Sequence, residues 1–180
     1  DGATDGAADA ADDEAGDGAV DAADASLPTL SIDSVAVDEG NAGTTSLTFT
    51  VTLSAASAQT VTADFLAADG TASALGGAVG GADYAAALGA VTFAPGDLTK
   101  QISINVNGDT VAEDNETLTV TLSNPSGATI AQAVGTGTIN NDDAVPSIAI
   151  ADSTVIEGNS GTTAADFKVT LSAVSGQTVT

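Results

Sequence analysis

The sequence predicts an all-β chain whose main unit is an antiparallel β-sandwich. Apolar residues alternate with Thr, Ser, Gln and Asn in several short segments, as in strands with one buried face. Turns containing Pro, Gly and Asn separate these segments, and no segment has helical periodicity. About seven short strands within about 115 residues are typical of a sandwich.

Four of these strands are expected in the first half of the sandwich. Residues 30–37 indicate a first strand with an irregularity in its middle, where the alternation is interrupted. Strict alternation at 47–53 and 61–65 predicts the second and third strands. A loop rich in Gly and Ala then leads to a short fourth strand at 90–93.

Three more strands are expected in the second half, at 102–106, 118–122 and 130–139. The last of them contains Gly135 and Gly137. Glycine inside a strand indicates close packing or a bulge, so we expect the backbone to approach another element there.

The end of the chain repeats its beginning. Residues 146–180 align without gaps on residues 28–62 at an offset of 118, and 20 of the 35 positions are identical. We therefore expect a sandwich at 28–145, followed at 146–180 by the incomplete N-terminal part of a second copy. Two strands are not stable alone, so a longer tandem chain or a strand from another chain is expected to complete this copy.

An acidic linker made mainly of Asp, Ala and Gly is expected at 1–27. Its first 25 residues contain nine acids and no aromatic residue, which favours a solvated spacer. Ordering by cations or by a neighbouring chain is the alternative. The chain has no Met and no signal sequence, so we expect an internal piece of a longer, processed polypeptide.

Composition excludes several classes of partner and site. The net charge is −23 and the only basic residues are Lys100 and Lys168, which excludes nucleic acid and anionic membranes. No apolar run reaches the roughly 18 residues that a membrane span needs. The chain has no Cys and no His, so any metal site must use oxygen ligands.

Strand direction predicts where the acids meet. In an antiparallel succession, the loops after the first, third and fifth strands lie at the same pole as the segment after the seventh. Ten of the thirteen acids of residues 28–145 fall there, and the opposite pole has only Asp97. The ten are Asp38, Glu39, Asp69, Asp83, Asp109, Glu113, Asp114, Glu116, Asp142 and Asp143.

A divalent cation site explains this pattern better than a solvated acidic surface does. An acidic surface would place acids on exposed strand positions, which here carry Thr, Ser, Gln and Asn. Two like charges about 4 Å apart cost roughly 4 kcal/mol at an effective dielectric constant of 20, and a bound cation reverses that sign. Flexible, carboxylate-rich loops favour calcium over magnesium. Asp38, Asp69 and Asp114 are the acids expected to point to solvent.

The order of short motifs points to a family. The motifs are Val37–Asn41, Asp69–Ala72, Ala82–Tyr84, Val91–Gly96, Asp109–Glu116, Leu122–Ser123 and Gly137–Asp143. In this order they resemble a Calx-beta domain. The resemblance covers residues 28–143 in full and 146–180 in part.

This resemblance implies an immunoglobulin-like sandwich of seven strands with calcium at one end. Matched residue by residue, the ligand positions fall on Glu39, Asp83, Asp109, Glu113, Glu116, Asp142 and Asp143, with Glu157 as the counterpart of Glu39 in the second copy. The chain departs from the family pattern at two places, Gly108 and Asn141, where the family often has acids. Fewer carboxylates predict weaker binding or fewer ions.

The function expected from these patterns is that of a calcium-binding structural or adhesive repeat in a large extracellular bacterial protein. Calcium would stiffen the junctions between repeats of a fibre, sheath or adhesin stalk. The partners would be calcium, neighbouring repeats and a surface or matrix component. A calcium-sensing regulatory module and a donor-strand subunit of a homopolymer are the alternatives. An enzyme is not expected, because no aromatic platform for a substrate is visible.

Overall fold

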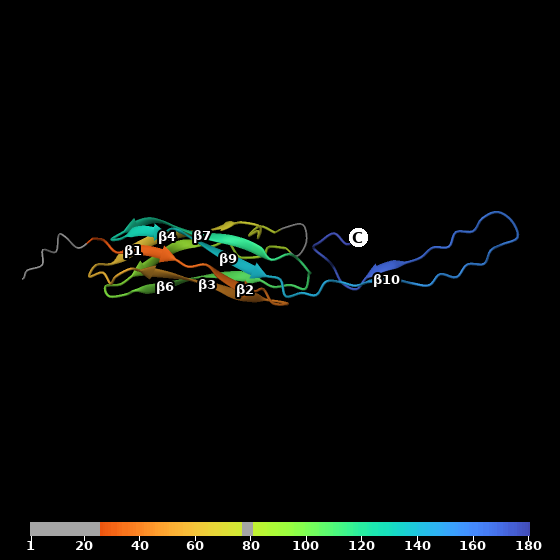
Figure 1. The fold of residues 1–180 in the computed structure, drawn as a ribbon, viewed down its shortest axis with the longest axis horizontal. Coiled ribbons are helices and arrows are strands. Elements are labelled where there is room, and N and C mark those ends of the chain that lie inside the picture. Colours follow the sequence, from red (N-terminus) through yellow and green to blue (C-terminus); the bar gives the residue numbers. More distant parts are fainter. Residues whose placement is uncertain (1–25, 77–80) are drawn as a thin grey trace, which may run out of the picture.

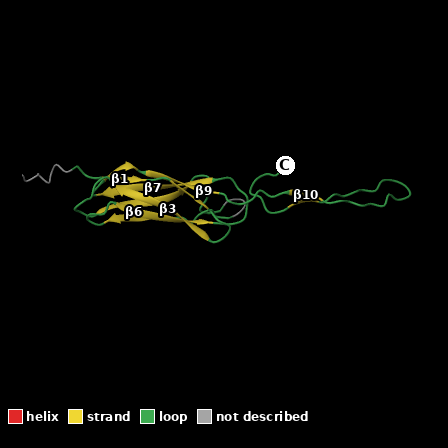
Figure 2. Cartoon of the chain, turned by 60° about the horizontal axis from the view of Figure 1, so that its bottom comes forward, coloured by secondary structure: helices red, strands yellow, loops and turns green. Residues whose placement is uncertain are grey.

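Alternating apolar and polar residues form nine strands in two packed sheets (Figures 1 and 2). The structure is a computed structural model that describes residues 26–76 and 81–180. The strands are β1 (Thr29–Ile32), β2 (Val35–Asp38), β3 (Thr44–Leu53), β4 (Val61–Asp69), β5 (Leu88–Phe93), β6 (Thr99–Asn107), β7 (Glu116–Ser126), β8 (Thr129–Gln132) and β9 (Val134–Asn140). One sheet has the order β6-β3-β1-β8 and the other has the order β2-β9-β7-β4-β5.

The first and last predicted strands are each divided between the two sheets, which corrects the expectation of a single strand in each place. The division after β1 is held by side chains, because Asp33 Oδ1 accepts a hydrogen bond from Thr50 N (2.7 Å) and Ser34 Oγ accepts one from Thr136 N (3.0 Å). The two halves then pair in parallel, β1 with β8 and β2 with β9. The other pairs within the sandwich are antiparallel.

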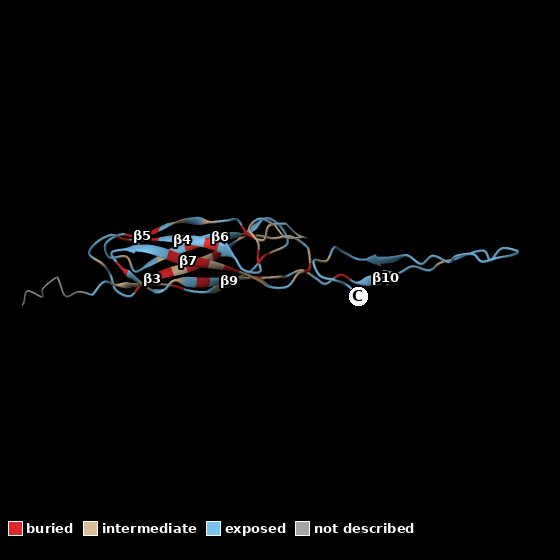
Figure 3. Cartoon of the chain, turned by 90° about the horizontal axis from the view of Figure 1, so that it is seen from above, coloured by how far each residue is buried: buried red, intermediate tan, exposed pale blue. Residues whose placement is uncertain are grey.

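The core lies between the inward faces of the two sheets (Figure 3). Its largest fully buried side chains include Tyr84, Phe49 and Phe93, which join Leu, Ile and Val residues from both sheets. All buried members of this core lie between Leu30 and Ile139. The nine strands of the sandwich therefore enclose one hydrophobic core.

Gly135 and Gly137 of β9 allow the two sheets to approach closely. A Cβ atom at Gly137 would lie 2.5 Å from Leu47 Cδ2 and 3.0 Å from Phe49 Cζ, both on β3. These distances are shorter than van der Waals contact, so the structure agrees with the close packing predicted for this strand.

Residues 146–180 extend from the sandwich as a long hairpin (Figure 1). Its strands are β10 (Ile148–Ile150) and β11 (Val169–Leu171), with Ile148 opposite Leu171. In the sandwich, Leu30 lies opposite Leu53, so the hairpin reproduces the register of β1 and β3 at the same offset of 118.

Some expectations fall outside the described residues or remain predictions. The acidic linker lies outside them except for Ser26 and Leu27. The division into three parts stays a prediction. Within the described residues, no helix could cross a membrane.

Replacing Gly137 with alanine is expected to destabilise the sandwich by about 1–3 kcal/mol, because the added methyl group overpacks the core against Leu47 and Phe49. Thermal unfolding should therefore begin several degrees lower than in the parent chain. Thr136→Ala is the matched control, since Thr136 is exposed on the same strand. Equal melting temperatures for the two variants would contradict this account of the close approach.

Candidate metal centre

Four segments of the chain meet at the pole from which the hairpin extends. They are the loops that follow β2, β4 and β6 and the segment that follows β9. This is the arrangement that strand direction predicts, and it brings two groups of carboxylates together, each with its oxygen atoms within 4.8 Å of one another.

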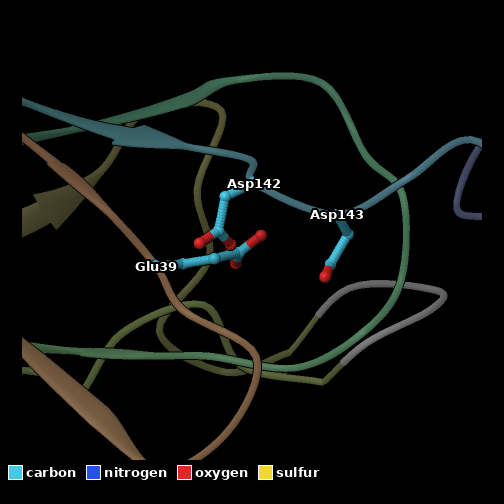
Figure 4. Close-up of side chains that lie close together, drawn as sticks. All are labelled: Glu39, Asp142 and Asp143. Carbon is cyan, nitrogen blue, oxygen red and sulfur yellow. The ribbon is translucent and has the colours of Figure 1, made fainter.

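The first group consists of Glu39, Asp142 and Asp143 (Figure 4). Glu39 is only 6% exposed, and its backbone is held by hydrogen bonds from Glu39 N to Asn140 O (3.1 Å) and from Thr45 Oγ1 to Glu39 O (2.8 Å). Asp143 Oδ2 is buried and has no hydrogen-bond donor among the described residues. A buried carboxylate oxygen without a donor costs free energy, which a cation would offset.

The second group consists of Asp83, Glu113 and Glu116. Asp83 Oδ2 accepts a hydrogen bond from Ser73 N (2.7 Å), which fixes the carboxylate on the loop after β4. Glu116 is the first residue of β7, and Glu113 lies three positions earlier in the loop. The second group thus joins the long loop after β4 to the acidic loop after β6.

Asp109 lies near both groups. Its charge contributes to raising the pKa of Glu39 in the first group and of Glu113 in the second. The neighbouring Gly108 explains how its loop comes so close, because a Cβ atom at Gly108 would lie 2.7 Å from Glu39 O. No side chain fits at position 108 without a shift of the backbone.

Burial and mutual repulsion raise the pKa of four carboxyl groups at this pole. Burial, followed by the charges of Asp109 and Asp143, raises the pKa of Glu39 to about 7. Burial, followed by a hydrogen bond to Asp83 and its charge, raises the pKa of Glu116 to about 7. Burial is also the main cause of the raised pKa values of Glu113 and Asp143.

Asn141 connects the two groups, a role that the sequence did not reveal. Its Oδ1 accepts a hydrogen bond from Glu113 N (3.1 Å), and its Nδ2 donates one to Asp143 O (3.1 Å). The sequence suggested only that an acid is missing here. An amide can both accept and donate, so it fixes two carboxylate-bearing segments where a carboxylate could only accept.

The three acids expected outside the site have hydrogen-bond partners of their own. Asp69 Oδ1 accepts a short hydrogen bond from the Tyr84 hydroxyl (2.6 Å), which is the main reason that the pKa of Asp69 is lowered. Asp38 accepts one from Asn140 Nδ2 (3.0 Å), and Asp114 accepts one from Gln177 Nε2 (2.6 Å).

Glu157 does not join the other predicted ligands. It is exposed in the hairpin, between β10 and β11. Its local backbone nevertheless matches that of Glu39, because Thr163 Oγ1 donates to Glu157 O (3.1 Å) as Thr45 does to Glu39 O. The hairpin lacks the other three segments that surround Glu39, so no group of three carboxylates forms around Glu157 among the described residues.

The acidic pole has no ion pair in the part of the chain that the structure describes. Among the described residues, the single ion pair joins Lys100 to Asp97 (2.7 Å) in the turn after β5, at the opposite end of the sandwich. The donor set at the acidic pole is therefore all oxygen and anionic, and it fits a hard divalent cation.

The sequence matches the Calx-beta domain family over residues 21–144. The fold is similar to that of an apo-form Calx CBD1 domain (TM-score 0.54, 24% identity, 65% of this chain and 99% of that chain). It is also similar to calcium binding domain CBD12 of CALX1.1 (TM-score 0.56, 24% identity, 72% of this chain and 53% of that chain). A Calx CBD2 domain is similar as well (TM-score 0.54, 14% identity, 63% of this chain and 86% of that chain). At sequence identities this low, the structural similarity shows a shared fold alone. No curated protein matches the sequence.

Without divalent cations, the chain is expected to be more stable near pH 5 than near pH 8. The folded state keeps protons on Glu39 and Glu116 up to a pKa of about 7, whereas an unfolded glutamate loses its proton near a pKa of about 4.3. The folded state thus binds more protons between these values, so stability falls as the pH rises through this window. Thermal unfolding in a chelator, from pH 5 to pH 8, measures this slope.

Glu39→Gln should flatten that slope, because it removes one of the carboxyl groups whose pKa is raised in the folded state. Glu157→Gln is the matched control, since it removes the same charge from an exposed position. If both variants kept the slope of the parent chain, the pH dependence would come from the overall net charge and not from the buried site.

Proposed function

Because the chain belongs to the Calx-beta domain family, we propose that the acid-rich pole of its sandwich binds calcium. The observation that supports this most directly is the pair of carboxylate groups, which includes a buried Asp143 oxygen without a hydrogen-bond donor among the described residues. Similar folds include one described as a calcium binding domain. Calcium accepts about six to eight oxygen ligands in flexible geometry, which suits sites on loops.

Each of the two groups of carboxylates would bind one ion. Glu39, Asp142 and Asp143 would hold one ion, and Asp83, Glu113 and Glu116 would hold a second, with Asp109 close to both. The charge of each bound ion would offset the repulsion between the carboxylates, which contributes to raising the pKa of Glu39 and Glu116. The acids then serve metal binding rather than catalysis.

Calcium is expected to stabilise the chain by about 2.7 kcal/mol per site at a free concentration 100 times the dissociation constant. The double variant Glu39→Gln, Glu116→Gln should weaken binding by at least about tenfold, because it removes one ligand from each group. Isothermal titration calorimetry and thermal unfolding at pH 7.5 measure both effects. Asp97→Asn, at the opposite pole, should bind as the parent does, and magnesium should bind more weakly.

An unchanged melting temperature in millimolar calcium, together with no heat of binding, would contradict the calcium site. Equal losses in the double variant and in Asp97→Asn would mean that calcium binds by overall charge.

We also propose that the chain is a structural repeat of an extracellular protein, in which calcium stiffens the junction to the next repeat. The segment that carries Asp142 and Asp143 continues through Ala144 and Val145 directly into the hairpin. Extracellular modules work with dissociation constants as weak as about 10⁻⁴–10⁻³ M, which suits the reduced number of carboxylates here. A calcium-sensing regulatory role would instead require a neighbouring domain whose activity follows calcium.

A second candidate role, strand exchange between chains, is supported by the exposed apolar side chains of the hairpin. Phe167, Val169 and Leu171 are 59%, 61% and 44% exposed, whereas their counterparts Phe49, Val51 and Leu53 are at most 2% exposed. In the sandwich, the sheet β2-β9-β7-β4-β5 covers these counterparts, so strands equivalent to that sheet would cover the hairpin surface, supplied by the same chain or by another copy. Light scattering of the chain across a concentration series separates these two cases.

Calcium is expected to protect the junction at residues 144–147 from proteolysis. Binding fixes Asp142 and Asp143, which lowers the local opening that a protease needs. Limited digestion with elastase, with and without calcium, followed by mass spectrometry, measures cleavage at this junction. The hairpin bend at 158–161 serves as an internal control, because neither of the two groups of carboxylates found among the described residues includes a residue of the bend. Equal protection at both places, or at neither, would contradict a junction role.

A further inference from the structure

The end of the hairpin returns to the sandwich and contacts its acidic loop. Ala112 pairs with Ser175 in a parallel β-bridge, and Gly176 N donates a hydrogen bond to Ala112 O (3.1 Å). Gln177 Nε2 donates a second hydrogen bond to Asp114 Oδ1 (2.6 Å). Ala112 is 5% exposed although it is not part of the hydrophobic core, so the contact lies over a buried position.

The turn that makes this contact is present twice in the chain. Residues 175–177 correspond to residues 57–59 at the offset of 118, and Ser and Gln are identical in both copies. The two turns have the same internal hydrogen bond, from Gln177 N to Ser175 Oγ (3.1 Å) and from Gln59 N to Ser57 Oγ (3.0 Å). The flanking strand pairs also share their register.

In the first copy, the same turn borders an open hollow of about 430 Å³. The hollow is lined by Ser26–Pro28, Ala55–Gln59 and Gly127. Within the described residues, the Ala58 N–H and the Gln59 side-chain amide have no hydrogen-bond acceptor, whereas their counterparts Gly176 and Gln177 are both bonded to the acidic loop. The first copy thus has the two hydrogen-bond donors of the contact, but no acidic loop lies against them to supply the acceptors.

We propose that the surface formed by residues 26–28 and 55–59 is a docking surface for the acidic loop of a preceding copy of this module. The partner loop is the equivalent of residues 112–114, and its Ala112 carbonyl and Asp114 carboxylate would accept from Ala58 N and Gln59 Nε2. The acid-rich pole would face a pole whose Asp97 is already paired with Lys100.

One position differs between the two turns, and this difference predicts how tightly each turn docks. A Cβ atom at Gly176 would lie 2.8 Å from Glu113 Cγ and 2.8 Å from Glu113 Oε1. The first copy has Ala58 at this position, so the Glu113 side chain of a preceding module must move aside when the surface docks. Ala58→Gly should therefore strengthen the docking.

The chain has no cysteine, so engineered disulfides can test the contact. In the full chain, Ala112→Cys with Ser175→Cys should form an internal bridge, because neighbouring strands lie about 4.8 Å apart and a disulfide spans Cα atoms about 4.4–6.8 Å apart. Ala112→Cys with Ser160→Cys is the control, since Ser160 lies in the distant hairpin bend between Gly158 and Gly161. Non-reducing mass spectrometry measures the bridge.

The docking surface itself is tested in a tandem protein in which residues 28–145 precede residues 28–180, so that Val145 joins Pro28 as it naturally joins Pro146. Cysteines replace Ala112 of the leading copy and Ser57 of the following copy. Bridge formation should exceed that of the control, with Ala42→Cys in the following copy, by at least about tenfold, because docking raises the effective concentration. Ala58→Gly in the following copy should increase it further.

Equal bridging at positions 57 and 42 would overturn the proposal, and so would failure of the internal bridge between positions 112 and 175. Should the cysteine variants fold poorly, amide exchange of Ala58 in the unsubstituted tandem decides instead. Its exchange should be slower than in the single chain, and an unchanged rate would overturn the proposal. Disulfide yield is measured in calcium and in chelator, so a failed docking surface is distinguishable from a failed calcium site.

Discussion

Repulsion among carboxylates at one pole of the sandwich is the constraint on which the rest of the structure depends. The fold gathers Glu39, Asp83 and their neighbours from four segments that are far apart in the chain. The repulsion is balanced by a core of Phe, Tyr and branched aliphatic residues that fixes those segments at their ends. The acidic pole is therefore a strained region that a rigid scaffold holds in place.

Much of this arrangement could be predicted from the sequence, because β-strand geometry has few alternatives. Alternation located the strands, and strand direction placed the acid-bearing loops at one pole before any contact was known. The crossing of the first and last strands between sheets could not be predicted. It depends on single hydrogen bonds, such as those of Asp33 and Ser34, which leave no periodic signal in the sequence.

The grouping of the acids into two sets also could not be predicted from the sequence. Spacing places Glu113 and Glu116 on the same loop, but it does not say that Asp83 from another loop completes their group. Asn141 illustrates the same limit, because its amide joins both groups through backbone atoms. The repeat was visible as identities at a constant offset, whereas the contact between Gln177 and Asp114 needed coordinates.

The parallel pairing of β1 with β8 and of β2 with β9 has a mechanical consequence. The chain enters the sandwich at one end through β1 and leaves it at the other end through β9, so a pull along the chain drives the paired strands past one another. Such a load acts in shear, and all the hydrogen bonds of the two ladders must yield together. These strands cannot unzip, that is, break their hydrogen bonds one at a time. The module is thus arranged to carry tension along the direction in which copies would follow one another.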